Sequence, residues 1–331
     1  MGTLRIYFTA DDLGRVTLAA APDPLWEVVL SRFRLRERPR PAFRLWVGDL
    51  RSRPERVARM REGAQLLDVL APMSPYWPDF LTPPEASNGL DSGLESFLST
   101  PRDRLSDELA RLALHRRLPG WVSSVAAGDA GMMIRVAAAM RAYHDAAIAP
   151  YHSLIGTAVA ADRAQRARDL LEGGTEGLFD GMAPLMRWRY PALDVTFGHD
   201  CELHLLGRGL RLVPSYFCQR VPVTLADPGL PPVLIYPIGQ KYRWERAVDG
   251  RSVEALLGRT RAAVLRNLST SATTSELART LEISPASASR HATVLRDAGL
   301  IVTARDGPAV LHTITPLGKA LLDGRILDRT T

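Results

Sequence analysis

Short polar side chains and one arginine recur between residues 284 and 293 at the spacing of one face of a helix. Hydroxyl and guanidinium groups of this kind donate hydrogen bonds to base edges and phosphates in nucleic-acid interfaces. An arginine can hold a guanine edge with two parallel hydrogen bonds, and serines beside it let a helix approach the groove closely. The candidate contact residues are Ser284, Ser287, Ser289, Arg290 and Thr293, with Arg305 farther along the chain. These residue types in this pattern indicate contact with double-stranded DNA.

Two short helices joined by a tight turn are predicted to position these side chains. Thr273 and Glu276 form the Thr-x-x-Glu pattern of a capping box, which starts the first helix. Ser284 followed by Pro285 starts the second, because serine caps a helix and proline needs no N–H in the first turn. Gly299 is typical of a helix end. The expected inward stripes are Leu277, Ala278 and Leu281 on the first helix, and Ala288, Ala292, Leu295 and Ala298 on the second.

A β-hairpin is predicted directly after the second helix. Residues 300–303 and 310–314 are rich in β-forming residues, and residues 305–308 between them are typical of a turn. Arg305 would lie near the tip of this hairpin. Its side chain could reach a phosphate or the minor groove there, whereas Arg290 would meet base edges in the major groove.

Residues 284–301 read Ser-Pro-x-Ser-x-Ser-x-His-x-x-x-Leu-Arg-x-Ala-Gly-Leu-Ile, followed by Arg-x-Gly from 305 and Ile-Thr-Pro-Leu-Gly from 314. This pattern resembles the winged helix-turn-helix of the ArsR/SmtB family of bacterial transcription regulators. Leu-Gly-Arg-Thr-Arg at 257–261 is similar to the first segment of that domain. The resemblance covers about the last quarter of the chain. It implies a DNA-binding domain, with terminal helices that pair two subunits into a homodimer.

Positive charge concentrates in the same part of the chain. Residues 251–331 contain eleven Lys and Arg against seven Asp and Glu, whereas the rest of the chain contains 31 against 29. The excess therefore lies where a phosphate backbone would be met. A winged-helix protein-interaction scaffold stays an alternative for this domain.

The length of 331 residues predicts two domains, and a composition of 46% hydrophobic and 24% charged residues is typical of globular proteins. The expected fold class is α+β, with an amino-terminal domain of mixed helices and antiparallel strands over residues 1–248. The winged helix-turn-helix would follow over residues 249–331. No apolar run approaches 18 residues and the start lacks a signal-peptide pattern, so we expect a cytoplasmic protein without membrane contact.

The amino-terminal domain divides into a helical part, about residues 1–183, and a strand-rich part, about residues 184–245. Asp23 with Pro24 predicts a helix start, and Gly173-Gly174 predicts a helix end. The basic run 32–40 is interpreted as a solvated helix end. One narrow helix face is expected to consist of Leu154, Ala158, Ala161, Ala164, Ala167 and Leu171.

After Pro184 the apolar period becomes alternating, which predicts successive strands with a hairpin at residues 207–209. A single helix from 253 to 268, capped by Ser252, is predicted to open the second domain. Residues 78–84, Pro-Asp-Phe-Leu-Thr-Pro-Pro, are similar to a segment in the long amino-terminal regions of some ArsR-like proteins, and the resemblance implies no chemistry for it.

The role of the amino-terminal domain stays open between three possibilities. A small-molecule sensor would need a pocket with apolar walls and a few polar groups. The aromatic candidates for such a pocket are Tyr143, Tyr151, Trp188, Tyr190 and Tyr236. An interaction module would instead expose an apolar patch, and a structural dimer scaffold would need neither.

Enzyme activity and cofactor binding are not expected. The sequence contains no Gly-x-Gly-x-x-Gly, Walker, Gly-x-Ser-x-Gly or His-Glu-x-x-His motif. The resemblance also suggests metal sensing as an alternative, because many ArsR-like proteins bind metal through cysteines near the position of residues 283–285. No cysteine occurs in the winged helix, and the only two, Cys201 and Cys218, are expected to be free thiols.

His199 and Cys201 could share one strand face as a metal site, but His204 would point to the opposite face. We therefore expect no bound metal. The sequence as a whole favours a homodimeric transcriptional repressor that binds an inverted-repeat operator in double-stranded DNA. Its amino-terminal domain would respond to a small molecule or a partner.

Overall fold

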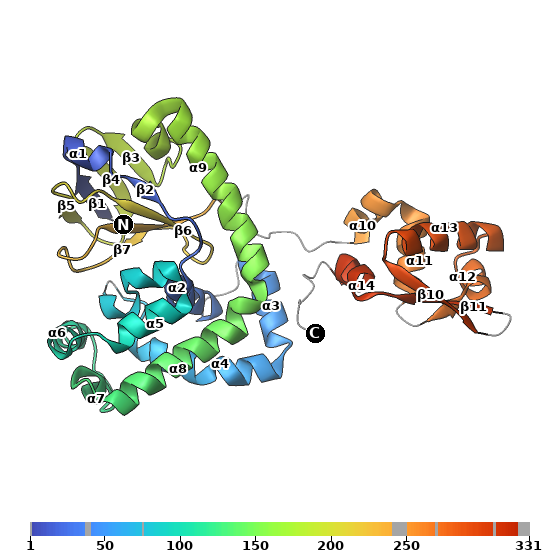
Figure 1. Ribbon diagram of the computed structural model, residues 1–331, viewed down its shortest axis with the longest axis horizontal. Coiled ribbons are helices and arrows are strands. Elements are labelled where there is room, and N and C mark those ends of the chain that lie inside the picture. Colours follow the sequence, from blue (N-terminus) through green and yellow to red (C-terminus); the bar gives the residue numbers. More distant parts are fainter. Residues whose placement is uncertain are drawn as a thin grey trace. The chain divides into compact units, whose positions relative to one another are not determined.

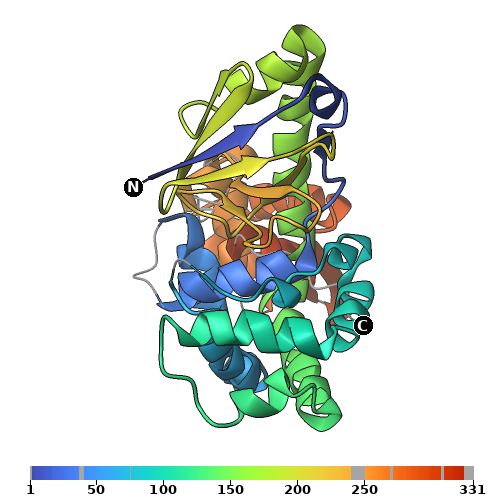
Figure 2. The same ribbon diagram turned by 90° about the vertical axis from the view of Figure 1, so that its left-hand side faces the viewer.

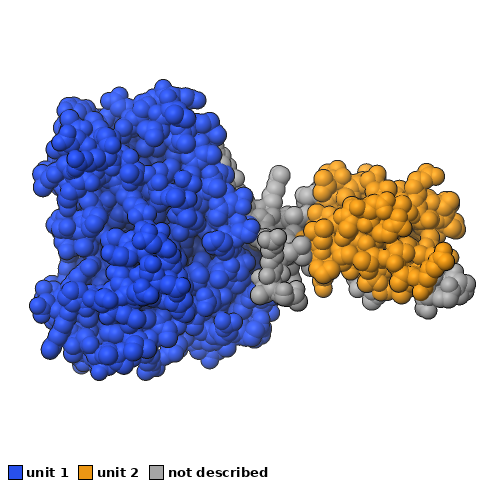
Figure 3. Space-filling view, in the orientation of Figure 1, with its two compact units in different colours: residues 1–243 blue, residues 244–331 orange. Residues whose placement is uncertain are grey.

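The computed structural model describes residues 2–36, 41–74, 76–239, 250–268, 271–306 and 309–323. The chain forms two compact units, unit 1 over residues 1–243 and unit 2 over residues 244–331 (Figure 3). The predicted domain boundary at residues 248 and 249 lies outside the described residues. Unit 1 contains helices and two mixed sheets, and unit 2 contains helices and a small antiparallel sheet, so the predicted fold class is confirmed.

Helices make up most of unit 1 up to residue 180. They are α1 (Ala10–Leu13), α2 (Pro24–Arg36), α3 (Arg44–Arg51), α4 (Pro54–Leu70), α5 (Leu90–Leu98), α6 (Arg102–Ala113), α7 (Val122–Ala126), α8 (Ala130–Ala147) and α9 (His152–Asp180). Four short 3-10 helices lie between them, Pro41–Phe43, Asp79–Leu81, Pro84–Asn88 and Ala149–Tyr151. The predicted cap of α2 is confirmed, because one carboxylate oxygen of Asp23 accepts from the N–H of Leu25 and Trp26, both at 3.1 Å. The predicted break at Gly174 is also confirmed, since its φ of 61° kinks α9.

Two four-stranded sheets complete unit 1. The first has the order β3 (Met186–Arg189), β4 (Ala192–Phe197), β1 (Gly2–Tyr7), β5 (Cys201–His204). The second has the order β2 (Thr17–Leu18), β6 (Arg211–Ser215), β8 (Val233–Pro237), β7 (Val223–Thr224). Strand β1 is antiparallel to β4 and parallel to β5, and β6 is parallel to both β2 and β8. The sheets are therefore mixed and not successive antiparallel strands.

The hairpin predicted at residues 207–209 was wrong, because β5 and β6 belong to different sheets. The N–H of Gly209 instead donates to the side chain of Asp12 at 2.8 Å, and Gly209 has a φ of 72°. Asp12 also accepts from Thr9 in the capping box of α1. The Asp12 carboxylate thus connects the segment between β5 and β6 to helix α1.

The second sheet lies between two cores. Leu212 and Leu234 contribute to the core shared with the first sheet, whereas Val213 and Ile235, which follow them, contribute to the core of the helices. Figures 1 and 2 show the sheets at one end of unit 1 and helices α2 to α8 at the other, with α9 extending along both. The alternation of β6 and β8 therefore connects the two halves of the unit.

Helix α2 is attached to the second sheet by a buried carboxylate. Glu27 is 1% exposed and accepts from the hydroxyl of Ser215 and from the N–H groups of Tyr216 and Phe217, at 3.0, 2.7 and 3.1 Å. The prediction of a solvated basic helix end was wrong for Arg32, which is 1% exposed and pairs with Asp68 at 2.5 Å. Arg34 is buried as well, and residues 37–40 lie outside the described residues.

The buried face of α9 differs from the predicted apolar stripe. Its buried positions include Ile155, Ala158, Val159, Asp162 and Arg166, whereas Ala164, Ala167 and Leu171 are exposed. Asp162 tolerates burial because it accepts from the hydroxyl of Tyr236 at 2.9 Å and from the N–H of Gly239 at 3.1 Å. The buried face of α9 thus includes polar residues and differs from the face that apolar spacing alone predicts.

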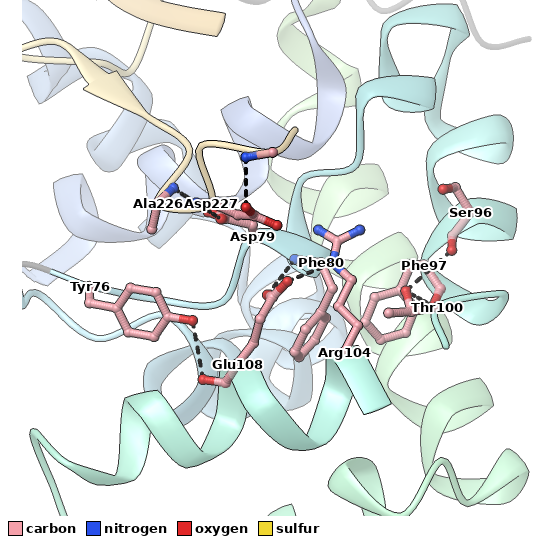
Figure 4. Close-up of polar contacts among 11 residues, drawn as sticks. Tyr76, Asp79, Phe80, Ser96, Phe97, Thr100, Arg104, Glu108, Ala226 and Asp227 are labelled. Carbon is pink, nitrogen blue, oxygen red and sulfur yellow. Dashed lines mark hydrogen bonds and ion pairs between the residues drawn. The ribbon is translucent and has the colours of Figure 1, made fainter. Parts of the chain in front are cut away.

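The proline-rich segment at 78–84 joins the helical half of unit 1 to the strands (Figure 4). Asp79 accepts from the N–H groups of Ala226 and Asp227, at 3.0 and 2.8 Å, and the N–H of Phe80 donates to Glu108 at 2.9 Å. Burial raises the pKa of Asp79 to about 6. The side chains at Asp79 and Phe80 are buried, so this segment is part of the core.

Unit 2 contains α10 (Gly250–Leu257), α11 (Arg259–Asn267), β9 (Ala272–Thr273), α12 (Thr274–Thr280), α13 (Pro285–Asp297), β10 (Ile301–Asp306), β11 (Ala309–Ile314) and α14 (Pro316–Asp323). The single helix predicted over residues 253–268 was wrong. Gly258, with a φ of 80°, divides it into α10 and α11. Among the described helices of both units, none combines the length and apolar character that crossing a membrane needs.

Candidate nucleic-acid interface

The first helix of the turn motif starts where its capping box predicts. The hydroxyl of Thr273 accepts from the N–H of Glu276 at 3.3 Å, and the Glu276 carboxylate accepts from the N–H of Thr273 at 2.7 Å. These hydrogen bonds lower the pKa of Glu276. Glu282 then adopts a φ of 53° in the turn, and the hydroxyl of Ser284 accepts from the N–H of Ser287 at 3.2 Å to start α13.

The inner face of α13 is largely the predicted one. Ala288, Ala292 and Leu295 are buried and pack in a core with Leu277 and Ala278 of α12. Leu281 is partly buried against the same core. Ala298 is exposed and not inward, because the helix ends there and Gly299 turns the chain with a φ of 70°.

The predicted contact residues of α13 differ in whether their hydrogen-bonding groups are still available for contact with DNA. Ser289, Arg290 and Thr293 are exposed, and Ser287 is half-buried. The hydroxyl of Ser284 is occupied as a cap, and the hydroxyl of Thr293 donates to the carbonyl of Ser289 at 3.0 Å. The guanidinium of Arg290 forms no hydrogen bond or ion pair with any described residue. Arg290 is thus the member of this group with the most donors available.

The hairpin predicted after α13 is confirmed as an antiparallel pair of β10 and β11, which form the wing. Arg305 pairs with Val310 across the hairpin and is exposed. The next pair, Asp306 with Ala309, is followed by residues 307–308, which lie outside the described residues. Strand β9 extends the sheet, because Thr273 pairs with Leu311. The wing is therefore fastened to the residue that caps α12.

A buried histidine connects the wing to the helices, and its role was not predicted. His312 is 4% exposed. One ring nitrogen lies 3.0 Å from the hydroxyl of Thr303 on β10, and the other lies 2.9 Å from the hydroxyl of Thr274 on α12. Burial lowers the pKa of His312, which favours the neutral ring. A single histidine within a β-branched run was the only signal in the sequence.

Cationic side chains remain free along the turn motif and the wing. Arg266 pairs with Glu254 at 2.8 Å and Arg296 pairs with Asp297 at 2.9 Å. Within the described residues, Arg279, Arg290 and Arg305 are exposed and form no ion pair. Arg290 and Arg305 belong to α13 and the wing, for which the sequence predicts DNA contact, and Arg279 on α12 was not among the predicted contacts.

The structure does not bring the five predicted pocket aromatics together. Tyr143 and Tyr151 are buried in the helical core, where their hydroxyls contact Ser31 at 3.0 Å and Asp49 at 2.6 Å. Tyr236 belongs to the core between the sheets, and Trp188 is partly buried against that core. Tyr190 is 68% exposed. Because these side chains are divided between two cores and the surface, they do not line one pocket.

The alternative metal ligands do not converge in the part of the chain that the structure describes. The ring of His199 lies against Phe197, and Cys201 is half-buried on β5. His204 stacks on Tyr7 with ring centroids 4.5 Å apart. No group of three or more His, Cys, Asp and Glu side chains among the described residues could hold a metal ion.

The family described as "Helix-turn-helix domain" matches residues 256–304, which run from α10 to β10. No curated protein and no solved structure matches the chain. The matched residues include the capping box, the turn, all of α13 and the start of the wing. Residues 256–304 are therefore a helix-turn-helix domain of the ArsR-like type, a DNA-binding domain of transcription regulators, at the carboxy-terminal side of a long amino-terminal region.

Proposed function

We propose that the protein is a homodimeric, cytoplasmic repressor that binds an inverted-repeat operator, without catalytic activity of its own. Helix α13 would enter the major groove and the wing would contact the flanking backbone. The observation that carries this proposal is the free guanidinium of Arg290 on the exposed face of α13, beside the short side chain of Ser289. A free cation flanked by small residues lets the helix approach base edges closely.

Two exposed leucines on neighbouring helices of unit 2 support the homodimer. Leu256 on α10 is 69% exposed, Leu317 on α14 is 45% exposed, and the two helices pack against each other. Exposed apolar side chains that lie on packed terminal helices are typical of a subunit interface. A twofold dimer places two copies of α13 about 34 Å apart, which corresponds to an inverted repeat with one helical turn between half-sites.

Unit 1 is the candidate for the responding part of the repressor. An open groove of about 460 Å³ lies between α5 and α8, where Leu98 and Ile134 are 42% and 59% exposed. Arg141 and Asp91 form an ion pair at its rim, with 2.5 Å between nitrogen and oxygen. An apolar groove with a charged rim supports the docking of a partner. A smaller cavity in unit 1, lined by Asp23, Trp26 and Thr82 among others, supports binding of a small molecule.

Selection of bound DNA from a random duplex pool tests this proposal. We expect the full chain to enrich an inverted repeat, because each subunit of a twofold dimer reads one half-site. The double variant Arg290→Ala and Arg305→Ala is the matched control, and it should enrich no sequence. Enrichment of a single half-site would contradict the dimer, and no enrichment by the wild-type chain would contradict sequence-specific binding.

A further inference from the structure

A small, partly enclosed cavity of about 60 Å³ lies in unit 1 beside the start of α2. Trp26, Val213 and Leu225 are among its apolar wall residues. Three polar side chains also line it, from three separate parts of the chain: Asp23, Thr82 and Arg211. An apolar cavity with a few converging polar groups is the usual form of a small-molecule site.

Thr82 is buried without a hydrogen-bond partner. The residue is 1% exposed, and its hydroxyl oxygen has no partner among the described residues. A buried hydroxyl normally finds a partner, because leaving it unsatisfied costs about 1–3 kcal/mol. The unsatisfied hydroxyl at the cavity wall therefore indicates that a bound molecule supplies the missing hydrogen bond.

Asp23 and Arg211 also have unused hydrogen-bonding capacity at the cavity. One carboxylate oxygen of Asp23 accepts from the N–H groups of Leu25 and Trp26, and the other makes no hydrogen bond with a described residue. The Arg211 guanidinium attracts the Asp23 carboxylate, but no ion pair joins them. A molecule between the two side chains could thus accept from Arg211 and donate to Asp23.

The charge and the size of the cavity restrict this molecule. One carboxylate and one guanidinium cancel, so a neutral molecule leaves no net charge in a buried site. A volume of about 60 Å³ corresponds to roughly four to six water molecules, and therefore to a ligand of about four or five non-hydrogen atoms. A primary amide has this size and carries both a donor and an acceptor.

We propose that this cavity binds a small neutral amide, whose N–H donates to Asp23, whose carbonyl oxygen accepts from Arg211 and whose remaining contact is the Thr82 hydroxyl. Val233, the first residue of β8, also lines the cavity, and β8 is the last described strand of unit 1. Binding would stabilise β8 against α2. The amide is then the effector class of the repressor, and that role rests on the proposed function.

Thermal unfolding of the full chain with increasing acetamide tests the site. Thr82→Val keeps the shape of the side chain and removes the hydroxyl. Without acetamide, this variant should unfold at the wild-type temperature or above it, because the lost hydroxyl had no partner. With acetamide, the wild type should gain stability as a ligand-bound protein does, and the variant should require about 2- to 10-fold more acetamide for the same gain.

Thr100→Val is the matched control, because the Thr100 hydroxyl donates to the carbonyl of Phe97 at 2.8 Å and is not among the residues that line the cavity. It should respond to acetamide as the wild type does. Acetate and acetamidinium have the size of the amide but carry a charge, and both should bind more weakly. Equal responses of wild type and Thr82→Val, or tighter binding of acetate, would overturn the proposal.

Operator binding measured with and without acetamide separates the cavity from the proposed function. Loss of operator affinity in the wild type but not in Thr82→Val supports the effector role. Acetamide binding without any change in operator affinity would overturn that role, although the site would stand. Intact operator binding without acetamide binding would overturn the site and leave the proposed repressor untouched.

Discussion

The side chains that remain available for DNA contact are those that the fold of unit 2 does not use. The sequence predicts Ser284 and Thr293 as polar contacts to DNA, yet both hydroxyls form hydrogen bonds with the backbone of α13. Arg290 and Arg305 have no ion-pair partner among the described residues. The two arginines are therefore expected to dominate the interface, with different roles because one lies on the helix and the other on the wing.

Arg290→Ala is expected to weaken binding to the operator by about 1–3 kcal/mol, because an arginine on a recognition helix contributes two hydrogen bonds to a guanine edge. The loss on random duplex should be much smaller. Titrations against operator and scrambled duplex measure both affinities. Arg296→Ala is the control on the same helix, since Arg296 pairs with Asp297 and should change the preference little. Equal losses on both duplexes for Arg290→Ala would mean that α13 is not the reading element.

Arg305→Ala should weaken binding to operator and scrambled duplex alike, because a contact to phosphate carries no sequence information. The slope of log affinity against log salt should flatten by about one unit. Titrations at several salt concentrations measure this slope. A selective loss on the operator with an unchanged salt slope would assign Arg305 to base readout.

His312 should make the stability of the wing depend on pH. Burial lowers its pKa from the ordinary value of 6.5, so the unfolded chain binds a proton more readily than the folded wing. The stability contributed by the neutral ring is therefore present above pH 6.5 and is lost as the pH falls toward the lower folded pKa. Amide exchange protection of β10 and β11, followed across this pH range, measures the effect.

His312→Gln should remove this pH dependence, because glutamine does not titrate. His291→Gln is the control, since His291 is the other histidine of unit 2 and lies half-buried on α13. It should leave the dependence unchanged. An identical pH profile for wild type and His312→Gln would show that a different group controls the wing.

At the scale of elements, α14 packs against the wing domain through a glycine. A Cβ atom at Gly318 would collide with the carbonyl oxygen of Leu300 and would lie 2.9 Å from the side chain of Ile314. Close backbone contact of this kind leaves no room for a side chain. The Gly in the Thr-Pro-Leu-Gly start of α14 thus serves packing rather than backbone flexibility.

Gly318→Ala is expected to lower the free energy of unfolding of unit 2 by about 2 kcal/mol, because overpacking forces the backbone to shift. Amide exchange of α13 and β10 reports on this unit. Gly173→Ala is the control, because no atom lies within 4 Å of the added Cβ and alanine favours a helix. It should be neutral or stabilising by up to about 1 kcal/mol. An unchanged unit 2 in Gly318→Ala would contradict the close packing of α14.

At the scale of the whole molecule, the proposed homodimer would form through unit 2 and not through unit 1. Leu317→Glu places a charge on the exposed face of α14 and should weaken dimerisation about tenfold or more, which corresponds to at least about 1.4 kcal/mol. Leu171→Glu is the control on α9, where Leu171 is 85% exposed. Light scattering over a concentration series measures both. Dissociation by Leu171→Glu alone would place the interface on unit 1.

The starts of helices and the inner face of α13 were predictable from the sequence. A cap is formed by residues within four positions of each other, as at Asp23, Thr273 and Ser284, so its geometry depends on no distant contact. The exposed candidate residues Arg290 and Arg305 followed from the same local spacing. Alternation also revealed most of the strands of unit 1.

Only the tertiary structure decided which strands pair and which polar groups are buried. Strand β1 pairs with β4 and β5, almost two hundred residues away, and Asp12 holds Gly209 at a similar separation. Arg32 and Asp162 are buried because distant groups satisfy them, and Thr82 lines a cavity together with the segments that contain Asp23, Arg211 and Val233. The local spacing of residues does not predict such contacts, because each contact depends on where a distant segment of the chain folds back. The pairing of the sheets and the cavity therefore emerge only from the folded chain.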